Sequence, residues 1–264
     1  MTDGGLEAHT TDYPQAALVT GAARRIGRAI ALDLAVHGWA VAVHHNRSAE
    51  AAGELVRQIV AAGGRAVALG ADLEREAEST GLIARAVEAL GPLGCLVNNA
   101  ARFERDEIAS VTRESWDRHL EPNLRAPLVL SQGFAAALPP ERCGVIINLL
   151  DERVWNLTPH FISYTVSKSA LWALTRTLAL ALAPRIRVNG IGPGPALPSA
   201  RQSAAQFARQ SASLPLGRGT SPQEICHAVQ FLLAAGSMTG QMIALDGGQH
   251  LGWAQAHKTK PPEE

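Results

Sequence analysis

Three residues with the chemistry for proton transfer lie close together in the sequence. Tyr164 and Lys168 are four positions apart, so on a helix their side chains project from the same face. A lysine ammonium stabilises a neighbouring phenolate, and we therefore expect it to lower the pKa of Tyr164 toward neutral pH. Asp151 follows an apolar run that predicts a buried strand, and open α/β sheets bind ligands at the ends of such strands. These three residues are candidate acid–base groups, although a Tyr–Lys pair at this spacing also occurs on helices without a catalytic role.

A glycine-containing loop follows the first predicted strand and leads into a helix. It reads Thr-Gly-Ala-Ala-Arg-Arg-Ile-Gly over residues 20–27. The N–H groups at such a helix start can bind a pyrophosphate. Gly21 permits the tight turn, Gly27 permits close packing of helix on strand, and Ile26 lies between the turn and the helix. Arg25 replaces the middle glycine of the usual dinucleotide pattern, which either brings a guanidinium to a phosphate or indicates an ordinary turn with solvated arginines.

The end of the second predicted strand indicates which dinucleotide binds. Sites that prefer NAD carry Asp or Glu at this point, where the carboxylate binds the ribose 2′-hydroxyl. This chain has His45, Asn46, Arg47 and Ser48, and no carboxylate before Glu50. Arg47 can neutralise a 2′-phosphate and Ser48 can donate a hydrogen bond to it, which favours NADPH/NADP⁺.

Neighbouring polar residues have more than one interpretation. His44 and His45 are adjacent, but successive side chains of a strand point to opposite faces, so we predict no metal site. Asp72 follows the third predicted strand, with Leu73 beside it. Asp72 can bind the adenine amino group or can cap a helix that starts near residue 74.

Strands and helices are predicted to alternate along the chain. Apolar runs predict strands at 16–20, 39–45, 66–69, 94–98, 145–150, 187–191 and 242–245. Helical periodicity predicts helices at 26–37, 49–62, 74–90, 112–138, 163–183, 199–212 and 222–235. Alternation of this kind is typical of a doubly wound, Rossmann-type α/β domain with a parallel sheet of about seven strands. We expect this single domain over 14–253, between polar tails at 1–13 and 254–264.

Composition excludes several classes of protein. The 264 residues are 47% hydrophobic and 18% charged, which is typical of a globular protein. The formal net charge of zero gives no reason to expect nucleic acid or an anionic membrane as partner. We see no signal peptide and no membrane-spanning run. Cys95, Cys143 and Cys226 have no metal-ligand spacing, and we expect them to be reduced thiols of a cytoplasmic protein.

Six motifs in this order resemble the short-chain dehydrogenase/reductase family over about residues 14–250. They are Thr-Gly-x-x-x-x-Ile-Gly, Asn98-Asn99-Ala100, Asn123, Tyr164-x-x-x-Lys168, Pro193-Gly194 and Asp246-Gly247-Gly248. The resemblance implies hydride transfer from a nicotinamide and a homotetrameric assembly.

The resemblance also implies roles for individual residues. Tyr164 would be the acid–base residue, and Lys168 would bind the nicotinamide ribose. Asn123 would fix a water of the proton relay, and Pro122 should loosen the helix beside it because proline lacks an N–H. The cofactor would be lined by Asn98, Asn99, Ala100, Pro193 and Gly194.

Asp151 departs from most family members, which have a serine thirteen residues before the tyrosine. With the Thr-Gly-Ala-Ala-Arg-Arg loop and His-x-Asn-Arg-Ser, it resembles the pteridine reductase branch, including bacterial dihydromonapterin reductases. An aspartate can accept N–H bonds from an aminopyrimidine edge or donate a proton. The resemblance implies that Phe103 stacks on the pterin and that Arg25 binds pterin and cofactor phosphate. The segment after Pro193 lacks the threonine with which many members bind the carboxamide.

Our first hypothesis is an NADPH-dependent reductase acting on CH–NH donors, which converts a dihydropterin of the monapterin or biopterin type to the tetrahydropterin, with dihydrofolate or oxidised pterins as further substrates. The first alternative is a ketone reductase of the same family, which Asp151 disfavours because a carboxylate repels a developing alkoxide. The second is a non-catalytic NADPH-binding sensor, which the presence of Asn123, Tyr164 and Lys168 disfavours.

Overall fold

The computed structural model describes residues 13–199 and 201–252 and contains a sheet of seven parallel strands. The strands lie in the order β3-β2-β1-β4-β5-β6-β7, so the topological switch point, where the strand order reverses, lies between β1 and β4. Their bounds are β1 Ala16–Val19, β2 Ala40–His45, β3 Ala66–Gly70, β4 Cys95–Asn98, β5 Gly144–Leu149, β6 Ile186–Pro193 and β7 Met242–Leu245. The predicted Rossmann-type fold is therefore confirmed.

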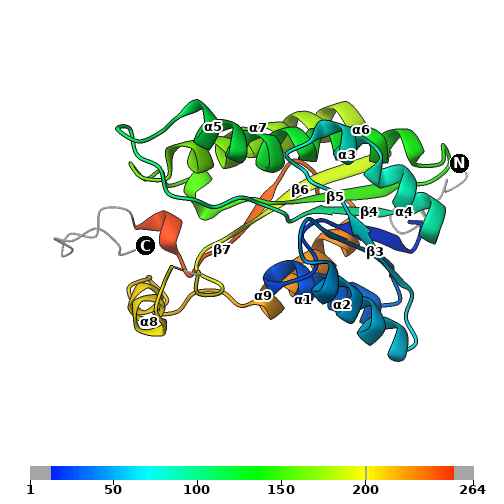
Figure 1. Cartoon of the computed structure of the whole chain (residues 1–264), viewed down its shortest axis with the longest axis horizontal. Coiled ribbons are helices and arrows are strands. Elements are labelled where there is room, and N and C mark those ends of the chain that lie inside the picture. The colour runs from blue at the N-terminus through cyan, green and yellow to red at the C-terminus, as the bar shows by residue number, and fades with distance from the viewer. Residues whose placement is uncertain (1–12, 200, 253–264) are drawn as a thin grey trace, which may run out of the picture.

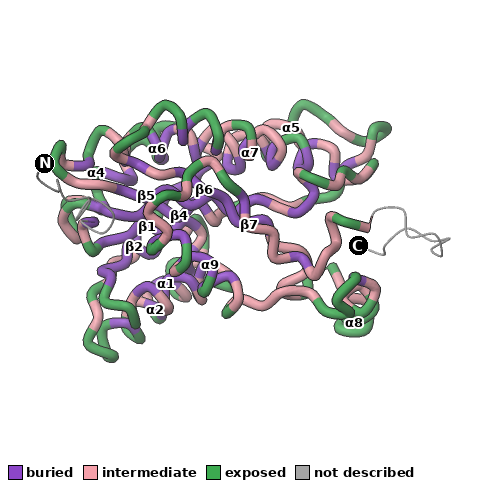
Figure 2. Tube along the Cα trace, turned by 180° about the vertical axis from the view of Figure 1, so that it is seen from behind, coloured by how far each residue is buried: buried purple, intermediate pink, exposed green. Residues whose placement is uncertain are grey.

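Helices cover both faces of this sheet (Figure 1). One face carries α1 Arg25–Val36, α2 Ala49–Ala61 and α9 Pro222–Ala234. The other carries α4 Leu82–Leu90, α6 Ala126–Ala137 and α7 Ile162–Leu182, with α3 Glu76–Thr80 and α5 Arg113–Leu120 beside them. The short helix α8, Ala204–Ala212, stands away from the sheet near the described C-terminal end (Figure 1). This layering explains why β1, β4 and β5 are buried along their whole length (Figure 2).

Three predicted helices differ from the observed ones. The helix predicted at 112–138 consists of α5, a π-helical turn at Glu121–Arg125, and α6. The one predicted at 74–90 is divided at Gly81 into α3 and α4. The one predicted at 199–212 begins only at residue 204, because Ser203 caps it by accepting a hydrogen bond from the backbone N–H of Gln206.

The N-terminal boundary also needs a correction. The tail was expected to include residue 13, but Tyr13 is buried and its hydroxyl accepts a hydrogen bond from Arg187 Nη2 at 2.8 Å. The domain therefore includes Tyr13. The rest of the predicted N-terminal tail, the tail at 254–264 and the boundary at 253 lie outside the described residues.

Other expectations concern cysteines, metals and membranes. All three cysteines have free thiols, and burial raises the pKa of Cys95 and of Cys226 to about 12, so neither ionises readily. Within residues 13–199 and 201–252, no group of His, Cys, Asp and Glu side chains could hold a metal ion. The helices of this same part of the chain are all too short or too polar to cross a bilayer.

Candidate active site

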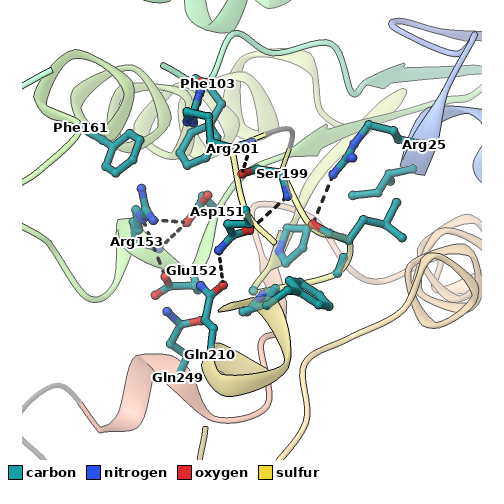
Figure 3. A pocket seen from close by; sticks show the side chains of 18 residues that line it. Arg25, Phe103, Asp151, Glu152, Arg153, Phe161, Ser199, Arg201, Gln210 and Gln249 are labelled. Carbon is teal, nitrogen blue, oxygen red and sulfur yellow. Dashed lines mark hydrogen bonds and ion pairs between the residues drawn. The ribbon is translucent and has the colours of Figure 1, made fainter. Parts of the chain in front are cut away.

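A pocket opens at the carboxyl ends of the central strands, where β1, β4, β5 and β6 each continue into a loop (Figure 3). Arg25 comes from the loop after β1 and Phe103 from the loop after β4. Asp151 follows β5, and Pro193 ends β6. Residues far apart in the sequence are thus brought together at the edge where an open α/β sheet binds ligands.

Asp151 and Tyr164 form a hydrogen-bonded pair at this pocket. The Tyr164 hydroxyl donates to Asp151 Oδ2 at 2.7 Å. Lys168 lies one helical turn farther along α7, but its ammonium donates to the carbonyl oxygen of Leu149 at 2.6 Å. The predicted grouping of Asp151, Tyr164 and Lys168 is therefore seen, with Asp151 rather than Lys168 in contact with the phenol.

The protonation behaviour of Tyr164 differs from our expectation. Burial and the charge of Asp151 raise the pKa of Tyr164 well above its ordinary value. Burial lowers the pKa of Lys168 to about 8, although Asp151 opposes this shift. The prediction that Lys168 lowers the pKa of Tyr164 is wrong, because desolvation penalises the phenolate and the nearest charge is negative. Tyr164 is consequently protonated at neutral pH, as a proton donor must be.

Arg153 is a residue of this pocket that the sequence did not single out. Its side chain is only 7% exposed and its Nε lies 3.8 Å from Asp151 Oδ1. Its guanidinium also lies 4.9 Å from the ring centre of Phe161 and 5.3 Å from that of Phe103. A charged residue four positions beyond a buried strand was the available signal, but its burial depends on contacts with distant loops.

Asn123 lies in the π-helical turn that follows Leu120, as the loosened helix beside Pro122 predicted. Its amide nitrogen donates to Arg102 O and to Ser167 Oγ, both at 3.0 Å. Its amide oxygen accepts from Arg102 N at 2.8 Å. The Asn123 side chain thus ties the loop after β4 to α7, and a relay water there would need the second lone pair of its amide oxygen or a main-chain carbonyl.

The glycine loop packs closely against the neighbouring backbone. Gly21 has a φ of +62°, and a Cβ there would lie 3.0 Å from the Cα of Ala100. A Cβ on Gly27 would lie 2.4 Å from the carbonyl oxygen of Gly21, so α1 could not pack as closely with any other residue. Ile26 lines the pocket beside this loop.

Asn99 and Ala100, which we expected to line the cofactor, hold the start of the glycine loop in place through hydrogen bonds to Thr20. Both backbone N–H groups donate to Thr20 Oγ1 at 2.9 Å, and Asn99 Nδ2 donates to Thr20 O at 2.8 Å. Asn98 does not line the pocket. Its amide donates to Asn148 Oδ1 at 2.8 Å inside the sheet, which corrects the role expected for it.

His44 is a second residue that the sequence reasoning missed. Its Nδ1 accepts a hydrogen bond from the N–H of Gly21 at 3.0 Å, and its Nε2 lies 3.1 Å from the carbonyl oxygen of Ala71. Nε2 must therefore carry the proton of a neutral imidazole. Burial lowers the pKa of His44 to about 4, which keeps the ring neutral. A polar side chain directly after the apolar part of β2, residues 40–43, was the signal for this role.

Arg25 adopts the left-handed conformation that glycine usually supplies at its position, with a φ of +55°. Its guanidinium donates to the carbonyl oxygens of Pro198 at 2.9 Å and Leu197 at 3.3 Å. Phe161 has the other positive φ among non-glycine residues of the described chain, and it lines the same pocket. Strained backbone of this kind gathers at functional sites.

The residues expected to bind a 2′-phosphate lie together at the end of β2. Asn46 and Arg47 are exposed, Ser48 is half-buried, and His45 packs its ring against Gly70. Their position is the carboxyl end of a parallel strand, the edge at which open α/β sheets bind ligands.

Asp72 and Leu73, beyond the end of β3, have mainly structural contacts. Asp72 Oδ1 accepts from Asn46 Nδ2 and from the N–H of Glu74, each at 3.1 Å. Asp72 thus caps a turn, and the helix that follows starts later than predicted, at Glu76. Leu73 is buried in the core, so only its backbone can face a ligand.

Aromatic rings form one wall of the pocket. Phe103 stacks on Phe161 at 4.8 Å between ring centres and meets the edge of Tyr164 at 4.7 Å. Arg201 donates from both terminal nitrogens to Phe103 O at 3.2 Å. Arg25 holds the same segment, which follows Gly194, through Leu197 and Pro198. Arg25 and Arg201 lie at different sides of the pocket in Figure 3.

The site fits a phosphorylated dinucleotide on its own geometry. Gly21 and Gly27 let the loop fold tightly against Ala100 and against itself at the N-terminus of α1, where backbone N–H groups can bind a pyrophosphate. The end of β2 offers Arg47 in place of an acidic residue. Arg25 and Ile26 line the pocket at one side, and Asp151, which accepts a hydrogen bond from Tyr164 of α7, lines it at the end of β5, as expected for the reactive end of a long ligand.

Comparison with known proteins identifies relatives of the whole domain. A family model described as Enoyl-(Acyl carrier protein) reductase matches residues 21–250. FolM alternative dihydrofolate reductase 1 of Brucella canis, solved in complex with NADP, is 47% identical, with a TM-score of 0.90 over 93% of this chain and 98% of that chain. The corresponding protein of Brucella suis, also with NADP, is 48% identical, with a TM-score of 0.86 over 91% of this chain and 97% of that one. A 3-oxoacyl-[acyl-carrier-protein] reductase of Synechocystis is 32% identical over 239 residues, which cover 89% of this chain and 96% of the relative.

Proposed function

The chain belongs to the short-chain dehydrogenase/reductase family, and on that premise we propose that it is an NADPH-dependent reductase of pterin rings. The reaction is reduction of a dihydropterin to a tetrahydropterin, with dihydrofolate as a further candidate substrate. The observation that carries this proposal is the hydrogen bond of 2.7 Å between Tyr164 and Asp151. A carboxylate at this point suits the N–H groups of an aminopyrimidine better than the oxygen of a ketone.

The cofactor assignment rests on the same site. Gly21, Gly27 and the start of α1 would bind the pyrophosphate, with Arg25 at the loop. Arg47 and Ser48 would bind the 2′-phosphate. Lys168 would bind the nicotinamide ribose, and Pro193 with Gly194 would line the nicotinamide. The two Brucella relatives are crystallised with NADP, which supports this assignment.

NADPH, when bound, supplies a hydride to an electron-poor C=N bond of the substrate ring. Tyr164 donates a proton to the ring nitrogen, and Asp151 accepts N–H bonds from the ring edge and orients the phenol. Phe103 stacks on the flat ring, which requires its contact with Phe161 to be remodelled or shared. A water fixed at Asn123 returns a proton to Tyr164. Holding the reactants in this arrangement contributes up to about 7–11 kcal/mol toward lowering the barrier.

The second candidate function is reduction of a ketone. It is favoured by the similarity to the 3-oxoacyl-[acyl-carrier-protein] reductase of Synechocystis. Asp151 counts against it, because its carboxylate lies where an alkoxide would develop next to Tyr164.

The deciding experiment measures NADPH oxidation with dihydropterins, dihydrofolate and a panel of ketones. Turnover of dihydropterins without turnover of ketones supports the proposal. Turnover of ketones alone overturns the substrate assignment and leaves the family membership intact. Tight NADPH binding without turnover of any substrate would instead support a sensor.

We also propose that the protein is a homotetramer. Val166 and Leu180 project from α7 with 40% and 85% of their surface exposed, and a symmetry-related helix would cover such apolar side chains. Light scattering on the purified protein measures the mass directly, and a monomeric mass would contradict the proposal.

A further inference from the structure

A buried guanidinium stands beside the proposed proton donor. Arg153 follows β5 in a short 3-10 turn, Glu152–Val154, and both Glu152 and Arg153 are buried. Its Nε lies 3.8 Å from Asp151 Oδ1 and 4.0 Å from Glu152 Oε1. Figure 3 shows Arg153 beside these two carboxylates and close to Phe161, with Arg25 on the opposite side of the pocket.

The two oxygens of Asp151 have different partners. Oδ1 accepts the backbone N–H of Arg153 at 3.0 Å and faces its guanidinium. Oδ2 accepts the hydroxyl of Tyr164 at 2.7 Å. The contacts on Oδ1 therefore determine which oxygen is presented to the phenol and at what angle.

Burial strengthens the electrostatic interaction between the Arg153 guanidinium and the Asp151 carboxylate, which lie 3.8 Å apart. An ion pair at the surface is weakened by water, whereas charges inside a protein interact more strongly and are costly to leave unpaired. Two other arginines reach the same aromatic pair from outside. Arg201 lies 5.2 Å from the ring centre of Phe103, and Arg105 lies 5.8 Å from that of Phe161, but both are exposed.

We infer that Arg153 is the positioning residue of the Asp151–Tyr164 pair: its guanidinium and backbone N–H orient Asp151 and balance its charge, so that Tyr164 can give up its proton. This inference rests on the proposed use of Asp151 and Tyr164 in proton transfer.

Electrostatics around Tyr164 agrees with this role. Burial and Asp151 raise the pKa of Tyr164, and Arg153 acts in the opposite direction. The other ionisable groups facing the pair are Glu152 from its own turn, Lys168 from α7 and His119 from α5, whose ring centre lies 6.2 Å from that of Tyr164. Removal of Arg153 would leave carboxylates as the nearest charges and make Tyr164 a weaker acid.

The test compares R153K, which keeps the positive charge, with R153Q, which removes it. R105Q is the matched control, because Arg105 approaches Phe161 but pairs with Glu107 at 2.7 Å on the outside. Each variant is assayed for the single-turnover rate, the pH profile of kcat/KM and the Kd of NADP⁺. The substrate is whichever compound the wild type reduces, so the test survives a wrong substrate assignment.

We expect R153Q to lose about 10- to 100-fold in single-turnover rate with little change in the Kd of NADP⁺. The pH of half-maximal kcat/KM should rise by about one unit, whereas R153K and R105Q stay near the wild type. Equal losses in R153K and R153Q would show a packing role and overturn the inference, as would an unchanged rate and pH profile in R153Q. If R153Q does not fold, the R153Q/E152Q double variant takes its place. It removes both buried charges together, so that no carboxylate is left unpaired at residue 152, and it is compared with the wild type in the same assays.

Discussion

The hydroxyl of Tyr164 donates to Oδ2 of Asp151 at 2.7 Å, across thirteen residues of sequence and two different elements. Asp151 ends the segment that leaves β5, and Tyr164 lies in the first turn of α7. This contact places a carboxylate where it can orient a proton donor and bind a substrate edge.

Replacing Asp151 should therefore damage the chemistry more than cofactor binding. We expect D151S to reduce kcat/KM for a dihydropterin by about 100-fold or more, because the phenol loses its acceptor and the ring loses a partner. D151N separates the effect of charge from that of shape. The Kd of NADP⁺ is the control and should change little. Undiminished pterin turnover in D151S would show that the carboxylate has no part in the reaction.

Phe103 should affect the ring substrate selectively. F103A removes an aromatic wall that contacts Phe161 and Tyr164, and we expect KM for the dihydropterin to rise about tenfold, as loss of one ring contact implies. F103Y keeps the ring and should remain near the wild type. Steady-state kinetics with each substrate varied in turn measures this. A rise in KM for NADPH alone would assign Phe103 to the cofactor instead.

Arg47 should decide the preference between NADPH and NADH. A charge-assisted contact with a 2′-phosphate contributes about 1.5–3 kcal/mol. The R47Q substitution should therefore weaken the binding of NADPH about 10- to 100-fold and leave the binding of NADH unchanged. R57Q is a matched control, since Arg57 is also exposed but lies farther along α2. Equal effects of R47Q on the two cofactors would contradict this role.

His44 makes stability depend on pH. Its pKa is lowered to about 4 in the folded protein from an ordinary value of 6.5. The unfolded chain therefore binds more protons between these values, and the contribution to stability, present above pH 6.5, is lost as the pH falls toward 4. Its size is at most about 3 kcal/mol.

Denaturant unfolding at several pH values tests this prediction. H44N should flatten the fall in unfolding free energy over this range, while its amide oxygen can still accept the N–H of Gly21. H37N is the control, because the His37 side chain is 50% exposed. Equal pH dependence in H44N and the wild type would show that other groups cause the loss.

Much of the fold was predictable because strand and helix patterns are local. Largely apolar runs such as 145–150 predict strands covered on both faces, and the alternation with helices predicts a parallel sheet. The predicted helix boundaries were less accurate where a capping residue or a proline interrupts the helical hydrogen bonding. Ser203 delays the start of α8, and the π turn around Asn123 divides a helix whose periodicity looked continuous.

The sequence by itself determined the glycine loop, the Tyr164–Lys168 spacing on one helix face and the alternation that predicts the sheet, because each depends on neighbours within a few residues. The tertiary structure decided that Asp151, not Lys168, contacts the phenol. It also decided that His44 fixes Gly21 and that Arg153 is buried beside Asp151. These contacts join loops from different strands, and the desolvation that sets their pKa values arises only when those loops pack together.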